Sequence, residues 1–155
     1  MMRWLALSAL VIALDQLSKY AVTRSLAYGE SIEVTPFFNL VLVHNRGAAF
    51  SFLSSASGWQ RELFIGIALA ASAWIVYLLR THPKQWLFCL ALSLVLGGAI
   101  GNVIDRIAVG AVVDFLDFHL AGWHWPAFNV ADSAITCGAV LLVYDSFRPV
   151  NTTAR

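Results

Sequence analysis

Residues 97–132 read GGAIGNVIDRIAVGAVVDFLDFHLAGWHWPAFNVAD, and the rest of the chain is interpreted around this stretch. It carries four carboxylates (Asp105, Asp114, Asp117 and Asp132), one arginine and two asparagines. Long apolar segments flank it on both sides. In a soluble protein these polar groups would be ordinary. Here they stand out, because most of the chain has the composition of membrane-spanning segments.

The composition indicates a membrane protein. Of the 155 residues, 59% are hydrophobic and 12% are charged, and the mean hydropathy is +0.73. Soluble domains carry about 25% charged residues, so this chain has about half the usual charge. Its length suits one domain, residues 1–155. The net charge of +1 comes with scattered cations and no basic stripe, which argues against a nucleic-acid partner.

Four apolar segments predict transmembrane helices, each near the ~20 residues that a bilayer requires. The first follows a single cation, Arg3, as the apolar part of a signal sequence does, but no small-x-small cleavage site comes after it. We therefore interpret this segment as a retained helix. The predicted spans are about residues 4–23, 63–79, 86–104 and 131–147.

Residues 28–52, between the first and second predicted helices, have a different character. Ser31–Thr35 alternates polar and apolar residues, and the stretch from Asn39 to His44 is rich in valine and leucine. Both patterns are typical of short strands, and both segments are too short to cross a membrane. The predicted fold class is therefore an α-helical membrane protein of four transmembrane helices, with a small extracytoplasmic β-sheet at the membrane surface.

The distribution of charge favours one orientation in the membrane. Four spans place both termini on the same side, together with the turn from Arg80 to Lys84. The two sides carry equal numbers of cations, but this turn is basic and contains no acid. Because cytoplasmic loops are enriched in Lys and Arg, we predict cytoplasmic termini. The polar motifs then gather at the outer face.

Polar residues recur at helical spacing in this chain. Asp15 and Lys19 are four positions apart, so they share a helix face and can form an ion pair. Asn102, Asp105 and Arg106 share a second face, and Asp105 is expected to pair with Arg106. Charges at membrane depth are costly and usually belong to an internal site. The other polar members of this group are Asn45, Arg46, Asp114, Asn129 and Asp132.

Asp114 and Asp132 are acids with no cation beside them in the sequence. Two carboxylates brought together cannot easily both ionise, so such a pair shares a proton near neutral pH. One acid can then act as general base on a water molecule and the other as general acid. No Ser/His/Asp arrangement, HExxH motif or metal-binding cysteine spacing appears. We therefore expect neither a metal nor a cofactor.

From the residues alone, three functions remain open. Paired acids in a membrane site fit an aspartyl hydrolase, and they also fit a small proton-coupled four-helix carrier that uses an acid such as Asp15. A carrier has little use for a surface sheet, and a purely structural subunit would explain none of the polar motifs. Two other features have simpler interpretations. We expect Asp117 to be a solvated surface acid and the Trp123–Trp125 cluster to be an interfacial anchor.

Five motifs, in this order, closely resemble lipoprotein signal peptidase, also called signal peptidase II. The resemblance runs from the first predicted helix to the fourth, and the ordered set is far more specific than any one motif. The motifs are Asp15-Gln16-x-x-Lys19; Asn45-x-Gly47-Ala48-Ala49-Phe50; Gly97-Gly98-Ala99-x-Gly101-Asn102-x-x-Asp105-Arg106; Val112-x-Asp114-Phe115; and Phe128-Asn129-x-Ala131-Asp132-Ser133-x-Ile135.

The resemblance implies a bacterial inner-membrane aspartyl protease that works as a monomer among membrane lipids. Its substrate would be a diacylglyceryl-modified prolipoprotein, cut just before the lipid-bearing cysteine. The cyclic peptide antibiotic globomycin would occupy the same site. By position, Asp114 and Asp132 match the family's catalytic pair. The residues that match its supporting polar groups are Asp15, Lys19, Asn45, Asn102, Arg106 and Asn129.

Overall fold

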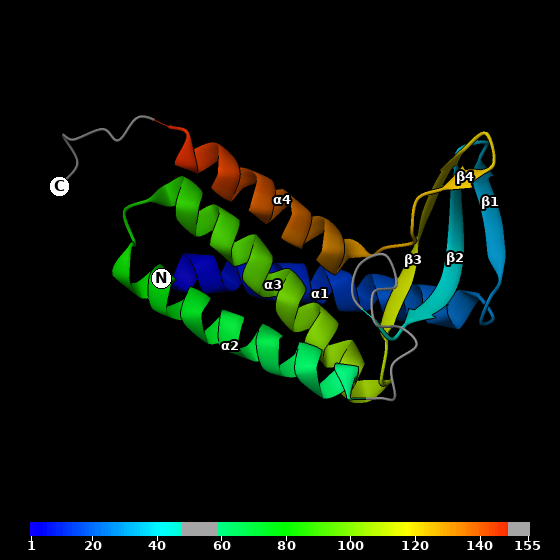
Figure 1. Cartoon of the computed structure of the whole chain (residues 1–155), viewed down its shortest axis with the longest axis horizontal. Coiled ribbons are helices and arrows are strands. Elements are labelled where there is room, and N and C mark those ends of the chain that lie inside the picture. The colour runs from blue at the N-terminus through cyan, green and yellow to red at the C-terminus, as the bar shows by residue number, and fades with distance from the viewer. Residues whose placement is uncertain (48–58, 149–155) are drawn as a thin grey trace.

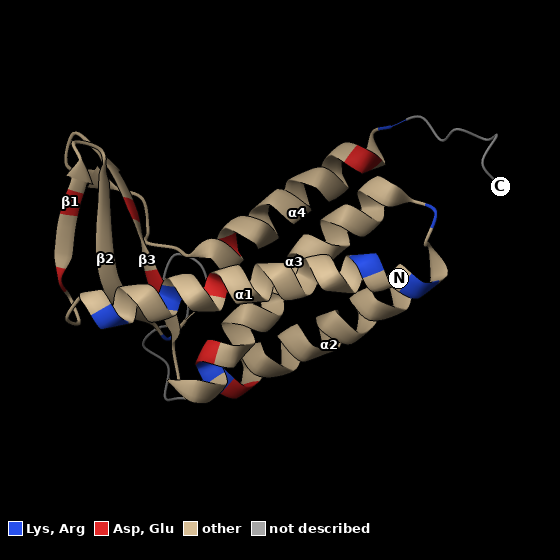
Figure 2. Ribbon diagram, turned by 180° about the vertical axis from the view of Figure 1, so that it is seen from behind, with Lys and Arg blue, Asp and Glu red and all other residues tan. Residues whose placement is uncertain are grey.

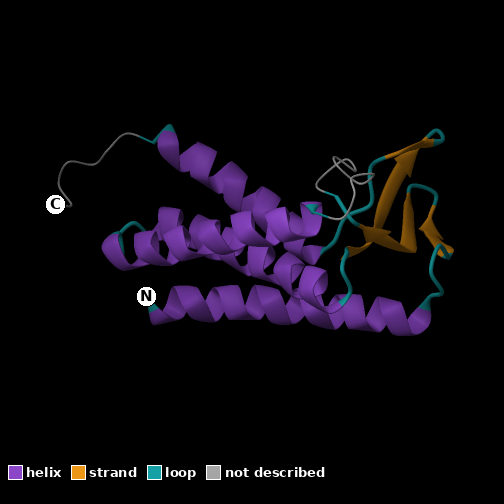
Figure 3. Cartoon of the chain, turned by 60° about the horizontal axis from the view of Figure 1, so that its bottom comes forward, coloured by secondary structure: helices purple, strands orange, loops and turns teal. Residues whose placement is uncertain are grey.

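The computed structural model describes residues 1–47 and 59–148 of the chain. Within these residues, four helices form an elongated bundle with a small sheet at one end (Figure 1). The start of α1 and the end of α4 lie at the other end (Figure 3). The helices are α1 (Met2–Ser25), α2 (Gln60–Thr81), α3 (Trp86–Ala108) and α4 (Val130–Ser146).

The helices lie close to the four predicted spans. In the described part of the chain, α1, α2 and α3 are long and apolar enough to cross a membrane, and α4 has 17 residues. Large apolar side chains point outward from the bundle, and Leu17, Ile67 and Val140 are each more than half exposed. Such exposure is unfavourable in water but not in lipid. Charged residues lie toward the two ends and on the sheet, away from the middle of the bundle (Figure 2).

α3 is the central helix and packs against each of the other three. Small residues permit this close approach, as is common between membrane helices. A Cβ atom added at Gly97 would lie 2.9 Å from the Ser8 carbonyl oxygen of α1. One added at Gly101 would lie 3.4 Å from the Ala131 Cβ of α4. The backbones of α1 and α4 therefore approach α3 where side chains would otherwise separate them.

The sheet holds the polar end of the bundle in place. Its strands run antiparallel in the order β1 to β4, with Val43 of β2 opposite Asp114 of β3. Leu26, at the end of α1, packs against Leu42 and Val113 and so attaches the sheet to the bundle. The strands are β1 (Ser31–Thr35), β2 (Phe38–Asn45), β3 (Val112–Leu120) and β4 (Trp123–His124).

The prediction of a sheet confined to residues 28–52 is therefore incomplete. β1 and β2 lie in that range, but β3 and β4 come from the connection between α3 and α4. The physical reason is that a two-stranded hairpin is only marginally stable in water and a third strand is needed to pair its edge. Residues 48–52 of the predicted range lie outside the described part of the chain.

Candidate active site

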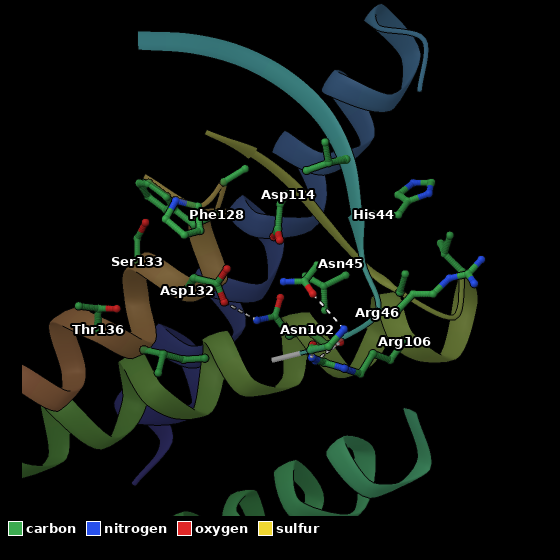
Figure 4. Close-up of a pocket in the computed structure, with 18 of the residues that line it drawn as sticks. His44, Asn45, Arg46, Asn102, Arg106, Asp114, Phe128, Asp132, Ser133 and Thr136 are labelled. Atoms are coloured by element: carbon green, nitrogen blue, oxygen red, sulfur yellow. Dashed lines mark hydrogen bonds between the residues drawn. The ribbon is translucent and has the colours of Figure 1, made fainter. Parts of the chain in front are cut away.

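A cavity of about 1230 Å³ lies where the sheet meets the ends of α3 and α4. Its lining comes from β2, α3, β3, α4 and the segment that leads into α4. Figure 4 shows polar side chains of these elements turned toward one another around this space. The polar lining residues that the sequence had singled out are Asn45, Arg46, Asn102, Arg106, Asp114 and Asp132.

Asp114 and Asp132 enter this cavity from different elements. Asp114 lies on β3 and is 1% exposed, and Asp132 lies in the first turn of α4. Figure 4 shows their carboxyl groups directed into the same space. Asn129 connects them, because its Nδ2 donates to Asp114 Oδ1 at 2.7 Å while its Oδ1 accepts from the Asp132 backbone nitrogen at 2.9 Å. The helix cap of α4 thus also fixes the geometry of the acid pair.

Strand alternation separates Asp114 from Asp117. Three positions apart on β3, the two acids point to opposite faces of the sheet. Of these two acids, Asp114 is the one that lines the cavity. The expectation that Asp117 is a solvated surface acid is wrong, because it is 7% exposed and accepts hydrogen bonds from Asn39 and His124. These partners lie on β2 and β4, and they meet Asp117 only because both strands pair with β3.

Burial raises the pKa of Asp114 to about 7. The negative charge of Asp132 acts in the same direction, since a second carboxylate disfavours ionisation. Hydrogen bonds from Asn45 and Asn129 favour the carboxylate but do not offset these two effects. The Asp114 carboxyl group is therefore poised to hold or release a proton at neutral pH.

Lys19 lies at the centre of a buried polar network beneath the acid pair. It is 3% exposed, and its Nζ contacts Asp15 Oδ2 at 2.8 Å, which confirms the predicted pair. The same Nζ contacts Asp105 Oδ2 at 2.7 Å and donates to Asn102 Oδ1 at 3.1 Å. All three hydrogens of the ammonium group therefore have acceptors, as a buried charge requires.

The expected pairing of Asp105 with Arg106 is wrong. Adjacent residues on a helix do not face each other, and Asp105 instead pairs with Lys19 across the α1–α3 interface. Arg106 turns toward the cavity, where it donates to the Gly47 carbonyl oxygen at 3.0 Å and to that of Asn102 at 3.3 Å. It therefore ties the segment that follows β2 to α3.

Asn102 connects Lys19 to the acid pair through hydrogen bonds. Its Oδ1 faces Lys19, and its Nδ2 donates to Asp132 Oδ1 at 2.8 Å. Because the lysine requires the oxygen, the amide of Asn102 is held in the one orientation that presents a donor to Asp132. Asp15 fixes the same region from α1, since its Oδ1 accepts from the Ala131 backbone nitrogen at 2.9 Å.

Gln16 and Trp125 also belong to the region of the cavity and its polar network, although the sequence did not single them out as site residues. Gln16 donates to Asp105 Oδ1 at 2.9 Å and to Asp15 Oδ2 at 3.1 Å, so it orients both acids around Lys19. Its place inside the first motif was the available signal. Trp125 lines the cavity, whereas its neighbour Trp123 is 71% exposed, so the two tryptophans of this cluster have different surroundings. Among the described residues, no group of His, Cys, Asp and Glu is arranged to hold a metal ion.

The chain is similar to known proteins along almost its whole length. The family model described as signal peptidase (SPase) II matches residues 7–148. The lipoprotein signal peptidase of Janthinobacterium sp. (strain Marseille) is 59% identical over 97% of this chain and 91% of its own length. That of Burkholderia vietnamiensis is 62% identical over 97% and 90%. A solved bacterial membrane enzyme, determined by the in meso method, superposes with a TM-score of 0.86 at 31% identity, covering 100% of this chain and 93% of that one.

Proposed function

The chain belongs to the signal peptidase II family, and we propose that it removes the signal peptide from diacylglyceryl-modified prolipoproteins by cutting just before the lipidated cysteine. Its peptidase activity follows from the family. The substrate is supported by the names of the relatives and by the position of the cavity at one end of an apolar bundle. A lipid-anchored peptide would meet a site at that depth without leaving the membrane. The proton-coupled carrier has no support in these comparisons.

The observation that carries the mechanism is the pair of carboxyl groups that share one cavity, with the pKa of Asp114 at about 7. We assign the shared proton of the resting pair to Asp114, which is almost fully buried. Asp132 then has the role of general base. It removes a proton from water as the water oxygen attacks the scissile carbonyl carbon, and Asp114 donates its proton to the carbonyl oxygen.

Collapse of the resulting diol completes the reaction. The proton held by Asp132 passes to the leaving nitrogen of the lipidated cysteine, and the carbon–nitrogen bond breaks. A hydroxyl proton of the diol returns to Asp114. The products are a signal peptide with a new carboxyl terminus and a lipoprotein with a free amine, and the acid pair regains its starting protonation state.

The supporting residues have positioning roles in this scheme. Lys19 and Asn102 hold Asp132 in place through the hydrogen bonds at 3.1 and 2.8 Å. Asn129 holds Asp114. Asn45 and Arg106 line the part of the cavity next to β2, where they can bind the substrate backbone. Residues fixed in this way supply the rigid surroundings that a catalytic pair needs.

We place residues 1–155 in the bacterial inner membrane as one embedded domain with four spans. Seventeen residues of α4 extend about 26 Å at 1.5 Å per residue, close to the ~30 Å hydrocarbon core. The turn with Arg80 and Lys84 lies at the end away from the sheet, which supports cytoplasmic termini and an outer active site. Monomeric action and inhibition by globomycin in the same cavity belong to this proposal.

The direct test is cleavage of a diacylglyceryl-modified prolipoprotein by the purified protein. Asp114→Asn and Asp132→Asn should each fold and lose at least 100-fold in kcat, because Asn keeps the shape but cannot carry the proton. Asp145→Asn makes the same change at the far end of α4 and should cleave normally. Mass spectrometry of the products locates the cut. Near-normal activity in either cavity variant would refute the acid pair, and an inactive wild-type protein would refute the proposed function.

A further inference from the structure

A second polar cluster lies on the sheet, on the face that Asp114 does not use. Asp117 of β3 is its centre. His124 Nδ1 of β4 donates to both carboxylate oxygens of Asp117, at 3.0 and 2.9 Å, and Asn39 Nδ2 of β2 donates at 3.0 Å. The His119 ring stacks on His124 with centroids 4.9 Å apart. The mechanism above uses none of these groups.

This cluster adds side-chain hydrogen bonds to a hairpin whose β3–β4 ladder is short. Between β3 and β4 only two residue pairs are in register, His119 with His124 and Leu120 with Trp123. The turn between them has Ala121 at φ 51° and Gly122 at φ 82°. A turn of this type favours asparagine and glycine, and alanine is strained at positive φ. The Asp117–His124 pair therefore holds together two strands whose ladder is short and whose turn is unfavourable.

The hairpin leads directly to the catalytic cavity. Successive residues of an extended chain point to opposite sides. His124 turns toward Asp117, and the next residue, Trp125, lines the cavity. The segment 125–128 forms one wall of that cavity and returns along β3, where Trp125 N donates to Phe118 O at 2.8 Å. One peptide unit separates the His124 side chain from Trp125, so a change at His124 should shift Trp125.

The acid pair is held by hydrogen bonds that involve neither β4 nor residues 125–128. Asn129 follows the wall segment, but its Nδ2 donates to Asp114, to Asn102 and to the Val113 carbonyl oxygen. It also caps α4 through Asp132. Loosening the hairpin should therefore displace the wall at Trp125 while the catalytic geometry persists.

We propose that His124 is a positioning residue for substrate binding: paired with Asp117, it holds Trp125 as the apolar wall that contacts the lipidated segment of the substrate. The inference rests on the proposed function and adds a specificity role for Trp125 to it. Trp125 is half exposed and contributes its indole to the lining of the cavity that holds the acid pair. An aromatic surface of that size suits the apolar chain next to the scissile bond.

The test compares kcat and KM for the lipidated substrate among single variants of the hairpin. His124→Phe keeps an aromatic ring but removes the donor. Because the His124 side chain is about half exposed, the loss should be that of one hydrogen bond of ordinary strength, which raises KM about fivefold with kcat unchanged. His124→Asn restores a donor at the position of Nδ1 and should return KM to within about twofold of wild type. Trp123→Ala alters the exposed face of the same hairpin and should leave both constants unchanged.

Trp125 supplies an independent check. Trp125→Ala should raise KM at least as much as His124→Phe, and the double variant should be no worse than Trp125→Ala alone, because His124 acts through Trp125. Additive effects, an unchanged KM in Trp125→Ala, or a loss confined to kcat in His124→Phe would overturn the inference. Cleavage by the wild-type protein in the same assay tests the proposed function separately.

Discussion

At the scale of single residues, the site places a carboxyl group where its charge is disfavoured. The pKa of Asp114 is about 7 in the folded protein, against an ordinary value of 3.8. Between these two values the folded state binds more protons than the unfolded state, so stability falls as pH rises through this range. Above pH 7 the folded state carries the full free-energy cost of an ionised Asp114. At about 1.4 kcal/mol per pKa unit, it amounts to roughly 4 kcal/mol.

Asp114→Asn should remove this penalty. The variant keeps the Oδ1 acceptor for Asn129 but cannot ionise, so it should exceed wild-type stability by up to roughly 4 kcal/mol at pH 8 and by little at pH 4. Thermal unfolding in detergent at the two pH values measures the difference. Asp145→Asn serves as the control and should leave the pH dependence of the wild type intact. A gain of equal size at both pH values would mean that ionisation of Asp114 does not limit stability.

At the scale of elements, one glycine determines how closely α3 approaches α1 at the site. A Cβ atom at Gly101 would lie 2.6 Å from Asp15 Oδ2, the oxygen that contacts Lys19. Asp15 also holds the start of α4 through the Ala131 backbone nitrogen. The helix interface and the polar network are therefore a single structure, and crowding one displaces the other.

Gly101→Ala should lower both stability and activity. Overpacking of a tight interface costs about 1–3 kcal/mol, and displacement of Asp15 should reduce cleavage by at least tenfold. Gly66→Ala is the matched control, because the space around that glycine of α2 is open. It should stabilise its helix by up to about 1 kcal/mol. Unfolding midpoints and cleavage rates of the two variants test the contrast, and equal stability would show that Gly101 is not a contact point.

At the scale of the whole molecule, the two ends of the bundle differ in charge. One end carries the polar cavity, and the turn between α2 and α3 at the other end is basic and contains no acid. The sheet and the cavity lie at the first end, and the turn containing Lys84 lies at the second (Figures 1 and 2). This asymmetry supports an orientation in which the cavity faces the outer side of the membrane and the turn faces the cytoplasm.

Single cysteines should reveal that orientation in intact cells. With Cys89 and Cys137 replaced by alanine, Glu33→Cys on β1 should react with a membrane-impermeant thiol reagent after the outer membrane is made permeable. Lys84→Cys should react only once the inner membrane is broken, because the proposed orientation places its turn on the cytoplasmic side. Retained cleavage activity shows that each variant is folded. The reverse labelling pattern would place the cavity in the cytoplasm.

Much of this structure can be predicted from the sequence, because span length, helical spacing and short motifs are local properties of the chain. A bilayer requires about 20 apolar residues in succession, so the helices follow from composition alone and lie near the predicted segments. Asp15 and Lys19 are one helical turn apart, so their pairing also follows from spacing. The motifs that carry the family resemblance are short and contiguous, and they contain the acid pair together with Asn45, Asn102 and Arg106 of the cavity lining.

The tertiary structure decided what depends on contacts between distant segments. Asp105 forms its ion pair with Lys19 and not with the adjacent Arg106, because packing of α1 on α3 brings the Lys19 and Asp105 side chains together. The sheet gains β3 from beyond α3, and Asp117 is buried by partners from β2 and β4. The raised pKa of Asp114 arises from burial and from Asp132, neither of which local spacing can supply. Sequence determined which groups are available, and packing determined which of them meet.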